Sequence, residues 1–146
     1  MNISARIANR TGENTVRVTT AGRERSLALP PKEDGSGSSV NGGELLFLAL
    51  ATCYCNDLYR EARKRGIELE SVEVEVEGQF GGEGEPARDI TYRAQVLANA
   101  SEEDIEELMR HTDAVAEIHN TLRRASSVTL VTCKGRESQS TRAGSD

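Results

Sequence analysis

The alternation of apolar and polar residues predicts three short strands before a long helix. The first thirty residues contain alternating runs over residues 3–9, 15–20 and 25–29. Turns that each contain a glycine separate these runs, which is typical of an antiparallel meander. Pro30 and Pro31 end the meander. Residues 32–39 predict a loop, because they combine two glycines, three serines and three charged residues.

A long helix is predicted over residues 42–65. Asn41 can cap its first turn, Glu44 stands in the capping-box position, and Gly66 is a typical residue at which a helix ends. Residues 45–51 are apolar on every side of the helix, so they must be buried all round. A chain of 146 residues with five aromatic residues supplies little to cover such a helix, so we expect a homodimer.

The second half of the chain predicts a hairpin, a helix and a closing strand. Residues 71–80 alternate valine with glutamate, which predicts a strand with one buried and one acidic face. A glycine-rich turn leads to a partner strand over residues 90–98, and Ser101 then caps a second helix. Residues 114–124 predict a short further helix or turn, and residues 128–133 a strand that closes the sheet. Residues 135–146 lack an apolar run and predict a disordered tail.

Length and composition predict one domain, which we place over residues 1–134 and interpret as α+β from its predicted strands and helices. They also disfavour several kinds of partner. The net charge of −6 opposes binding to nucleic acid or to an anionic membrane. The longest apolar run is about a third of the roughly 20 residues that a membrane-spanning helix needs. The sequence begins without an apolar signal segment, so we expect a cytoplasmic protein. It contains none of the glycine motifs that bind nucleotides, and we predict no cofactor.

The three cysteines are too few for a disulfide scaffold, so each is either an inert buried thiol or a thiol that takes part in a reaction. Cys53 and Cys55 face opposite ways, because two residues rotate a helix by about 200°. Cys53 lies where its helix face changes from apolar to polar, which is typical of a ligand pocket, although a buried structural thiol is the other interpretation. Cys55 is predicted to pack against the sheet. It shares an apolar stripe with Leu48, Ala51, Leu58, Tyr59 and Ala62.

Residues 43–54, GELLFLALATCY, followed by Arg65-Gly66-Ile67 and the valine–glutamate strand, resemble the OsmC/Ohr family of osmotically inducible and organic hydroperoxide resistance proteins. The resemblance extends over about residues 3–133, and residues 118–122, IHNTL, look like the second motif of the family. It implies an OsmC-like fold, in which antiparallel sheets pack on two long central helices of an intertwined homodimer. In the peroxidase branches it also implies a thiol that reduces organic hydroperoxides, and Cys53 matches that catalytic cysteine.

A thiol in a leucine-rich helix needs a nearby cation to become a thiolate. Arg60 is one source, because it lies on the same helix face as Cys53, although a solvated surface arginine is the commoner interpretation. The resemblance implies another source, the N-terminal strands, and does not decide between their arginines. The candidates there are Arg6, Arg10, Arg17, Arg23 and Arg25. We take Arg17, Arg60 and Glu44 as candidate binding residues.

The sequence departs from the peroxidase branches at two positions. Their resolving cysteine would align near Ala116, so turnover here requires an external thiol, or Cys133 as a substitute. Cys133 is more simply explained as a core residue of the last strand. The glutamate that orients the arginine in those branches would stand at Gly43, so Glu44 is better explained as a capping residue.

Two functions remain open. The first is a thiol peroxidase that uses Cys53 on a small apolar or peroxide substrate, with an external thiol as reductant. The second is a protein without enzymatic activity that binds a small molecule in a pocket at the dimer interface. His111 and His119, with the acidic residues between them, form a weak set of metal ligands because one continuous helix through Ala114 is not predicted. We therefore predict no metal site.

Overall fold

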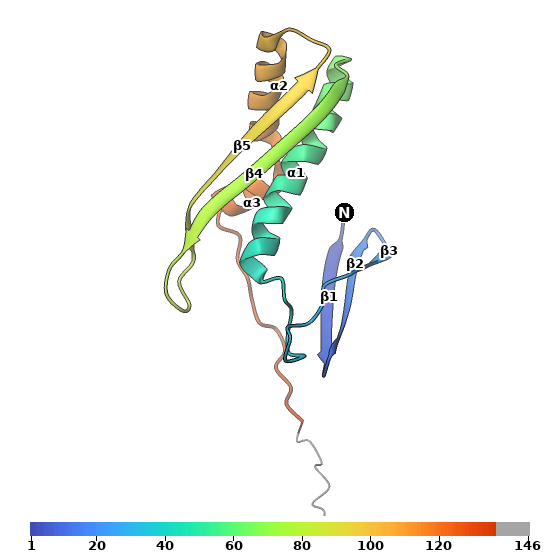
Figure 1. Ribbon diagram of the computed structural model, residues 1–146, viewed down its shortest axis with the longest axis vertical. Coiled ribbons are helices and arrows are strands. Elements are labelled where there is room, and N and C mark those ends of the chain that lie inside the picture. The colour runs from blue at the N-terminus through green and yellow to red at the C-terminus, as the bar shows by residue number, and fades with distance from the viewer. Residues whose placement is uncertain (137–146) are drawn as a thin grey trace, which may run out of the picture.

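The computed structural model describes residues 1–136, which form a three-stranded sheet, a two-stranded hairpin and three helices (Figure 1). The first sheet is antiparallel and contains β1 (Ile3–Arg10), β2 (Glu13–Thr20) and β3 (Arg23–Leu27), in that order. This confirms the predicted meander. The third strand ends two residues earlier than expected, because the chain already turns away towards Pro30 and Pro31.

The long helix α1 (Gly42–Arg65) has the boundaries that its capping residues predict. The Asn41 side chain accepts a hydrogen bond from the backbone N–H of Glu44 at 2.9 Å, and the Glu44 carboxylate accepts one from the backbone N–H of Asn41 at 2.7 Å. Gly66 ends the helix with φ at 68°, in the left-handed region that favours glycine. The capping box thus fixes the first turn of the helix that carries Cys53.

The hairpin consists of β4 (Leu69–Phe80) and β5 (Ala87–Ala98), which pair antiparallel. Val72 lies opposite Val96 and Val74 opposite Ala94, and these side chains pack against the buried residues of α1. The glutamates that alternate with the valines are exposed, as predicted. Figure 1 shows the hairpin lying across α1, with α2 alongside.

Two glycines give room to an aromatic pair at the start of α1. The rings of Phe47 and Phe80 lie 5.7 Å apart. A Cβ atom at Gly78 would lie 2.8 Å from Cζ of Phe47, and one at Gly43 would lie 2.8 Å from Cε2 of Phe80. Both distances are shorter than van der Waals contact. The absence of side chains at these positions therefore lets the two rings meet.

Helix α2 (Glu102–Val115) begins at Ser101, whose hydroxyl accepts a hydrogen bond from the backbone N–H of Asp104 at 3.2 Å. Helix α3 (Glu117–Arg123) follows after Ala116, whose extended backbone separates the two helices. This agrees with the short further helix or turn expected over residues 114–124. The change of direction at the buried Ala116 brings Glu117 to face α1.

The buried core lies between α1, α2 and the hairpin. Its fully packed members are Tyr54, Leu58, Ala62, Leu108 and Ala116. In the first sheet Val16 is the one buried residue among those described. Figure 1 shows this sheet standing apart from the hairpin, beside the first turns of α1.

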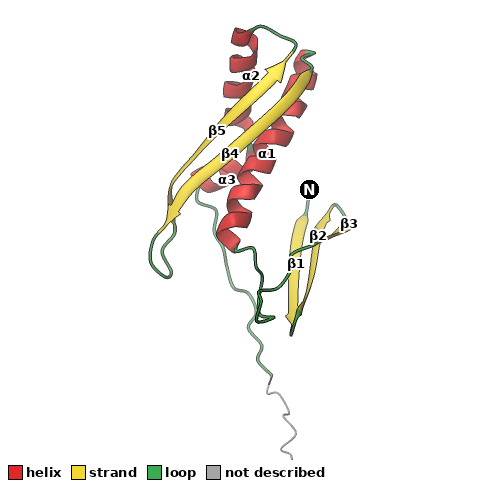
Figure 2. Cartoon of the chain, viewed as in Figure 1, coloured by secondary structure: helices red, strands yellow, loops and turns green. Residues whose placement is uncertain are grey.

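The predicted closing strand over residues 128–133 is wrong for the single chain. This segment has no regular structure, and it appears as a loop in Figure 2. Val128 is 100% exposed, Leu130 82% and Val131 88%. The apolar pattern suits a strand, but a strand also needs a partner edge, and neither sheet of the described chain pairs with this segment. Of the predicted tail, residues 137–146 lie outside the described residues.

The apolar segment at the start of α1 is not covered on every side by its own chain. Within residues 45–51, Leu50 is 3% exposed but Leu48 is 59% exposed. The single chain therefore leaves one side of this segment open, and the homodimer stays a prediction. No helix among residues 1–136 combines the length and apolar character needed to cross a membrane.

Candidate functional site

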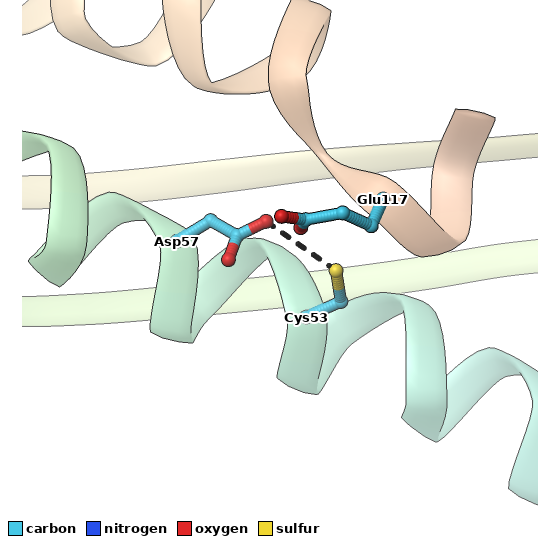
Figure 3. A group of neighbouring side chains, drawn as sticks. All are labelled: Cys53, Asp57 and Glu117. Atoms are coloured by element: carbon cyan, nitrogen blue, oxygen red, sulfur yellow. Dashed lines mark hydrogen bonds between the residues drawn. The ribbon is translucent and has the colours of Figure 1, made fainter. Parts of the chain in front are cut away.

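Cys53 lies on the side of α1 that faces the start of α3 (Figure 3). Its half-buried Sγ donates a hydrogen bond to Oδ2 of Asp57, one helical turn further on, at 3.4 Å. Glu117 points towards the same place from α3. The thiol and the two carboxylates offer donor atoms that all lie within 4.8 Å of one another. We call these three residues the thiol–carboxylate cluster.

Arg60 binds the carboxylates of this cluster. Its guanidinium lies 2.6 Å from Oδ1 of Asp57 and 3.3 Å from Oε1 of Glu117, and a further 2.9 Å contact joins it to Glu61. The Arg60 side chain is 38% exposed, and its guanidinium pairs with carboxylates rather than with the sulfur of Cys53. Its positive charge is used to hold two acidic side chains from different helices together.

Burial, together with the neighbouring carboxylates, favours the protonated thiol of Cys53. Burial raises the pKa of Cys53, a hydrogen bond from the backbone of Ile118 lowers it, and the charges of Asp57 and Glu117 raise it again. Burial also raises the pKa of Asp57, which is 5% exposed and lies beside Glu117. Because the raising effects prevail, the thiolate is scarcer at neutral pH than for an ordinary cysteine.

The thiol–carboxylate cluster has the ligand types and the spacing to hold one cation. A thiolate with two carboxylates would suit a metal such as zinc. However, Arg60 already pairs with both carboxylates, and a metal ion would have to displace its guanidinium. The histidines considered from the sequence are elsewhere: His111 binds Glu61 at 3.2 Å, and His119 is buried against two tyrosine rings.

The other two thiols have different surroundings. Cys55 is half-buried beside a shallow hollow that Val74 of β4 also lines, and Cys133 is exposed in the segment without regular structure. The predicted core stripe through Cys55 is wrong in part, because Leu48 and Tyr59 are exposed. The hairpin and α2 cover α1 along a neighbouring stripe. Its buried members are Leu50, Tyr54, Leu58 and Ala62.

The remaining candidate residues are not brought to Cys53 within one chain. Glu44 is engaged in the capping box at the first turn of α1. Arg17 forms an ion pair with Glu24 on the first sheet. The arginines of the N-terminal strands do not figure among the described groups that shift the pKa of Cys53. Arg6, Arg10 and Arg17 instead line an open hollow of about 620 Å³ on the first sheet.

Reasoning from the sequence missed the acidic character of the site. Asp57 stands four residues after Cys53, and this spacing places two side chains next to each other on a helix. That signal was available, because Asp57 shares the predicted face of Cys53. Glu117 gave no such signal, since its approach depends on how α3 packs after Ala116.

The geometry can now be compared with known proteins. The family model described as OsmC-like protein matches residues 35–131, which is about two thirds of the chain. The chain belongs to the OsmC-like family. Its antiparallel sheets and its helices are those of solved OsmC-like structures, so the fold expected from the resemblance is confirmed for the single chain.

An uncharacterized protein of Bacillus subtilis, YmaD, is 38% identical to this OsmC-like chain over 53 residues. The match covers 36% of this chain and about a third, 35%, of that relative. An OsmC-like protein from Mycoplasma pneumoniae has a TM-score of 0.59 at 20% identity, covering 86% of this chain and 91% of that one. An OsmC-like hydroperoxide resistance protein from Jannaschia sp. has a TM-score of 0.52 at 14% identity, covering 86% and 87%. At these identities the two structures establish the fold.

Proposed function

We propose that this OsmC-like protein reduces organic hydroperoxides through the thiol of Cys53. The observation that carries the proposal is the position of that thiol. Cys53 is the cysteine of α1 that faces the start of α3, where hydrogen-bonding groups from two helices surround the sulfur. The hydroperoxide resistance protein of the same fold supports this choice of reaction.

The proposed reaction has two steps. The sulfur of Cys53 attacks the terminal oxygen of the hydroperoxide, the O–O bond breaks, and the products are a sulfenic acid on Cys53 and an alcohol. Two molecules of an external thiol then reduce the sulfenic acid: they form a disulfide, and water leaves. The external reductant is required because Ala116 stands where the resemblance places the resolving cysteine.

The homodimer is part of this proposal. Within one chain the arginines of the first sheet do not act on Cys53, and this sheet also exposes Ile7 by 53%. Leu48, on the start of α1, is exposed by 59%. Association of two chains through these apolar side chains would cover them, and would give an arginine of one copy access to the Cys53 of the other. A cation there would counteract the two carboxylates.

The test is the consumption of cumene hydroperoxide in the presence of a dithiol. We expect slow consumption by the natural protein and none by Cys53→Ser. Cys55→Ser is the matched control, since it removes a half-buried thiol from the same helix, and it should retain the activity. After one equivalent of peroxide without reductant, dimedone should label Cys53. Equal activity of Cys53→Ser and the natural protein would reject the proposal.

The second candidate is a binding protein without enzymatic activity, which uses a pocket at the dimer interface. The pair of carboxylates beside Cys53 favours it, because they oppose formation of the thiolate. In that case the natural protein and Cys53→Ser should both leave the peroxide unconsumed. Binding of small apolar molecules would then survive the Cys53→Ser substitution.

A further inference from the structure

The two carboxylate oxygens of Asp57 have different partners. Its Oδ1 accepts a hydrogen bond from the guanidinium of Arg60 at 2.6 Å, while its Oδ2 accepts the one from Sγ of Cys53 at 3.4 Å. Arg60 therefore fixes the carboxylate without occupying the oxygen that faces the thiol. Asp57 is buried, whereas Cys53 is half-buried, so the sulfur is more accessible from outside than its acceptor. The thiol is thus paired with one fixed and shielded proton acceptor.

The proposed peroxidase reaction requires a proton to change places. At rest the thiol of Cys53 is favoured in its protonated form, because of burial and the neighbouring carboxylates. The sulfur must lose this proton when it bonds to oxygen, and the alkoxide that leaves must gain one to become an alcohol. An alkoxide is a strong base, so a positioned acid lowers the barrier to its departure. One carboxyl group beside the sulfur can serve first as the base and then as the acid.

Oδ2 of Asp57 has the position that both transfers need. It already accepts the hydrogen bond of the thiol, as the dashed line in Figure 3 shows. During the attack the leaving oxygen is two partial bonds from the same sulfur, so it passes close to a group that contacts Sγ. Burial raises the pKa of Asp57, which makes its carboxylate a better base than an exposed one. Glu117 lies nearby, but the thiol donates to Asp57.

We propose that Asp57 carries this proton, an inference that rests on the peroxidase activity proposed above. Oδ2 takes the proton from Sγ as the sulfur bonds to the terminal oxygen of the hydroperoxide. As the O–O bond breaks, the same carboxyl group donates the proton to the departing oxygen. The thiol and the hydroperoxide become a sulfenic acid and an alcohol, and Asp57 returns to its carboxylate form. Cys53 therefore need not be ionised before the peroxide arrives.

The test separates ionisation of the thiol from delivery of the proton. Asp57→Asn keeps the shape of the side chain but removes the proton carrier. Iodoacetamide reacts with the thiolate and releases iodide, which needs no proton, so this rate measures the thiolate alone. In Asp57→Asn alkylation of Cys53 should become faster, whereas its oxidation by cumene hydroperoxide should become slower. The ratio of oxidation to alkylation should fall about a hundredfold, the lower end of the usual contribution of acid–base catalysis.

Peracetic acid is the internal control, because it releases acetate, a weak base that leaves without being protonated. Its rate of oxidation of Cys53, relative to alkylation, should be the same in Asp57→Asn and in the natural protein. Glu117→Gln is the matched variant, since it also removes a charge that raises the pKa of Cys53 but keeps the acceptor of the thiol proton. In Glu117→Gln, alkylation and oxidation by cumene hydroperoxide should become faster together. Peptide mapping after a timed quench measures each rate at Cys53.

A measurement on the natural protein does not depend on the folding of any variant. Heavy water should slow the oxidation of Cys53 by cumene hydroperoxide more than its oxidation by peracetic acid, because a proton moves to the leaving oxygen only in the first reaction. Equal slowing of both reactions would overturn the proposal, as would an unchanged ratio for cumene hydroperoxide in Asp57→Asn. An equal loss with peracetic acid in that variant would do the same, because it indicates a disturbed site. If the natural protein does not oxidise at Cys53, the peroxidase function itself is rejected.

Discussion

We call α1, the hairpin, α2 and α3 together the helix–hairpin unit. In this unit Leu58 and Leu108 are 0% exposed, whereas Val16 of the first sheet is 8% exposed. The helix–hairpin unit buries a continuous core, to which the consecutive elements α1, β4, β5 and α2 contribute. The first sheet has complete hydrogen-bonded ladders but little apolar burial. A sheet with an uncovered apolar face is marginal in water. The comparison shows that one region is covered by its own chain and the other is not, and we propose that a second copy covers the other.

The largest effect expected from this comparison is the loss of core packing. Leu58→Ala should lower the free energy of unfolding by about 2–5 kcal/mol, because it leaves a cavity at a fully buried site. Ile7→Ala, at a position 53% exposed within one chain, should have a smaller effect that grows with protein concentration. Urea unfolding at two protein concentrations measures both. A concentration-independent effect of Ile7→Ala would break the comparison.

The second prediction concerns association. Leu48→Glu should weaken the homodimer by more than tenfold, because burying a leucine side chain contributes about 1.5–3 kcal/mol and a buried charge opposes association. Light scattering over a dilution series gives the dissociation constant. Gln95→Glu, which adds the same charge on the exposed face of the hairpin, should leave the dimer intact. A monomeric natural protein at micromolar concentration contradicts the proposed assembly.

The third prediction assigns acid sensitivity to the helix–hairpin unit. Hydrogen bonds from Lys64 and Arg60 lower the pKa of Glu61 from 4.5 to about 2. A carboxylate whose pKa is lower in the folded than in the unfolded chain stabilises the fold at pH values above the unfolded pKa. This contribution of Glu61 is therefore lost as the pH falls from about 4.5 towards 2. Urea midpoints of Glu61→Gln should therefore depend less on pH in this range. Glu70→Gln, at an exposed position, is the control. Equal pH slopes in the two variants would be the contrary result.

The smallest expected effect lies at the thiol–carboxylate cluster. Asp57→Asn removes a charge that raises the pKa of Cys53, so alkylation by iodoacetamide at pH 7.5 should become about three- to tenfold faster. In the natural protein the rate should rise with pH throughout this region, because the thiolate is the reacting form. Peptide mapping compares Cys53 with Cys55 in the same sample. Slower alkylation of Cys53 in Asp57→Asn would refute the electrostatic assignment.

Local signals predicted the elements of the fold well. Asn41, Glu44 and Gly66 fix the ends of α1 through neighbouring residues, and the valine–glutamate alternation identifies β4 in the same way. The prediction of a strand over residues 128–133 was wrong. Its apolar pattern indicates a preference for a strand but does not identify a partner edge.

The candidate site was predicted less completely than the fold. The position of Cys53 on its helix followed from periodicity alone. The contact between Arg60 and Glu117 did not, because it joins residues 57 positions apart across a change of direction at Ala116. The lone imidazole of His119 likewise depends on what surrounds it in three dimensions.

The glycine that lies against Phe80 limits which side chains position 43 can accept. The resemblance places the arginine-orienting glutamate of the peroxidase branches at Gly43. In this chain any side chain there begins 2.8 Å from the ring of Phe80, and that ring packs on Phe47, which itself depends on Gly78. A glutamate at position 43 therefore requires Phe80 to move or to become smaller. The aromatic pair thus makes a glutamate at position 43 conditional on a second change, in which the ring of Phe80 shifts or is replaced.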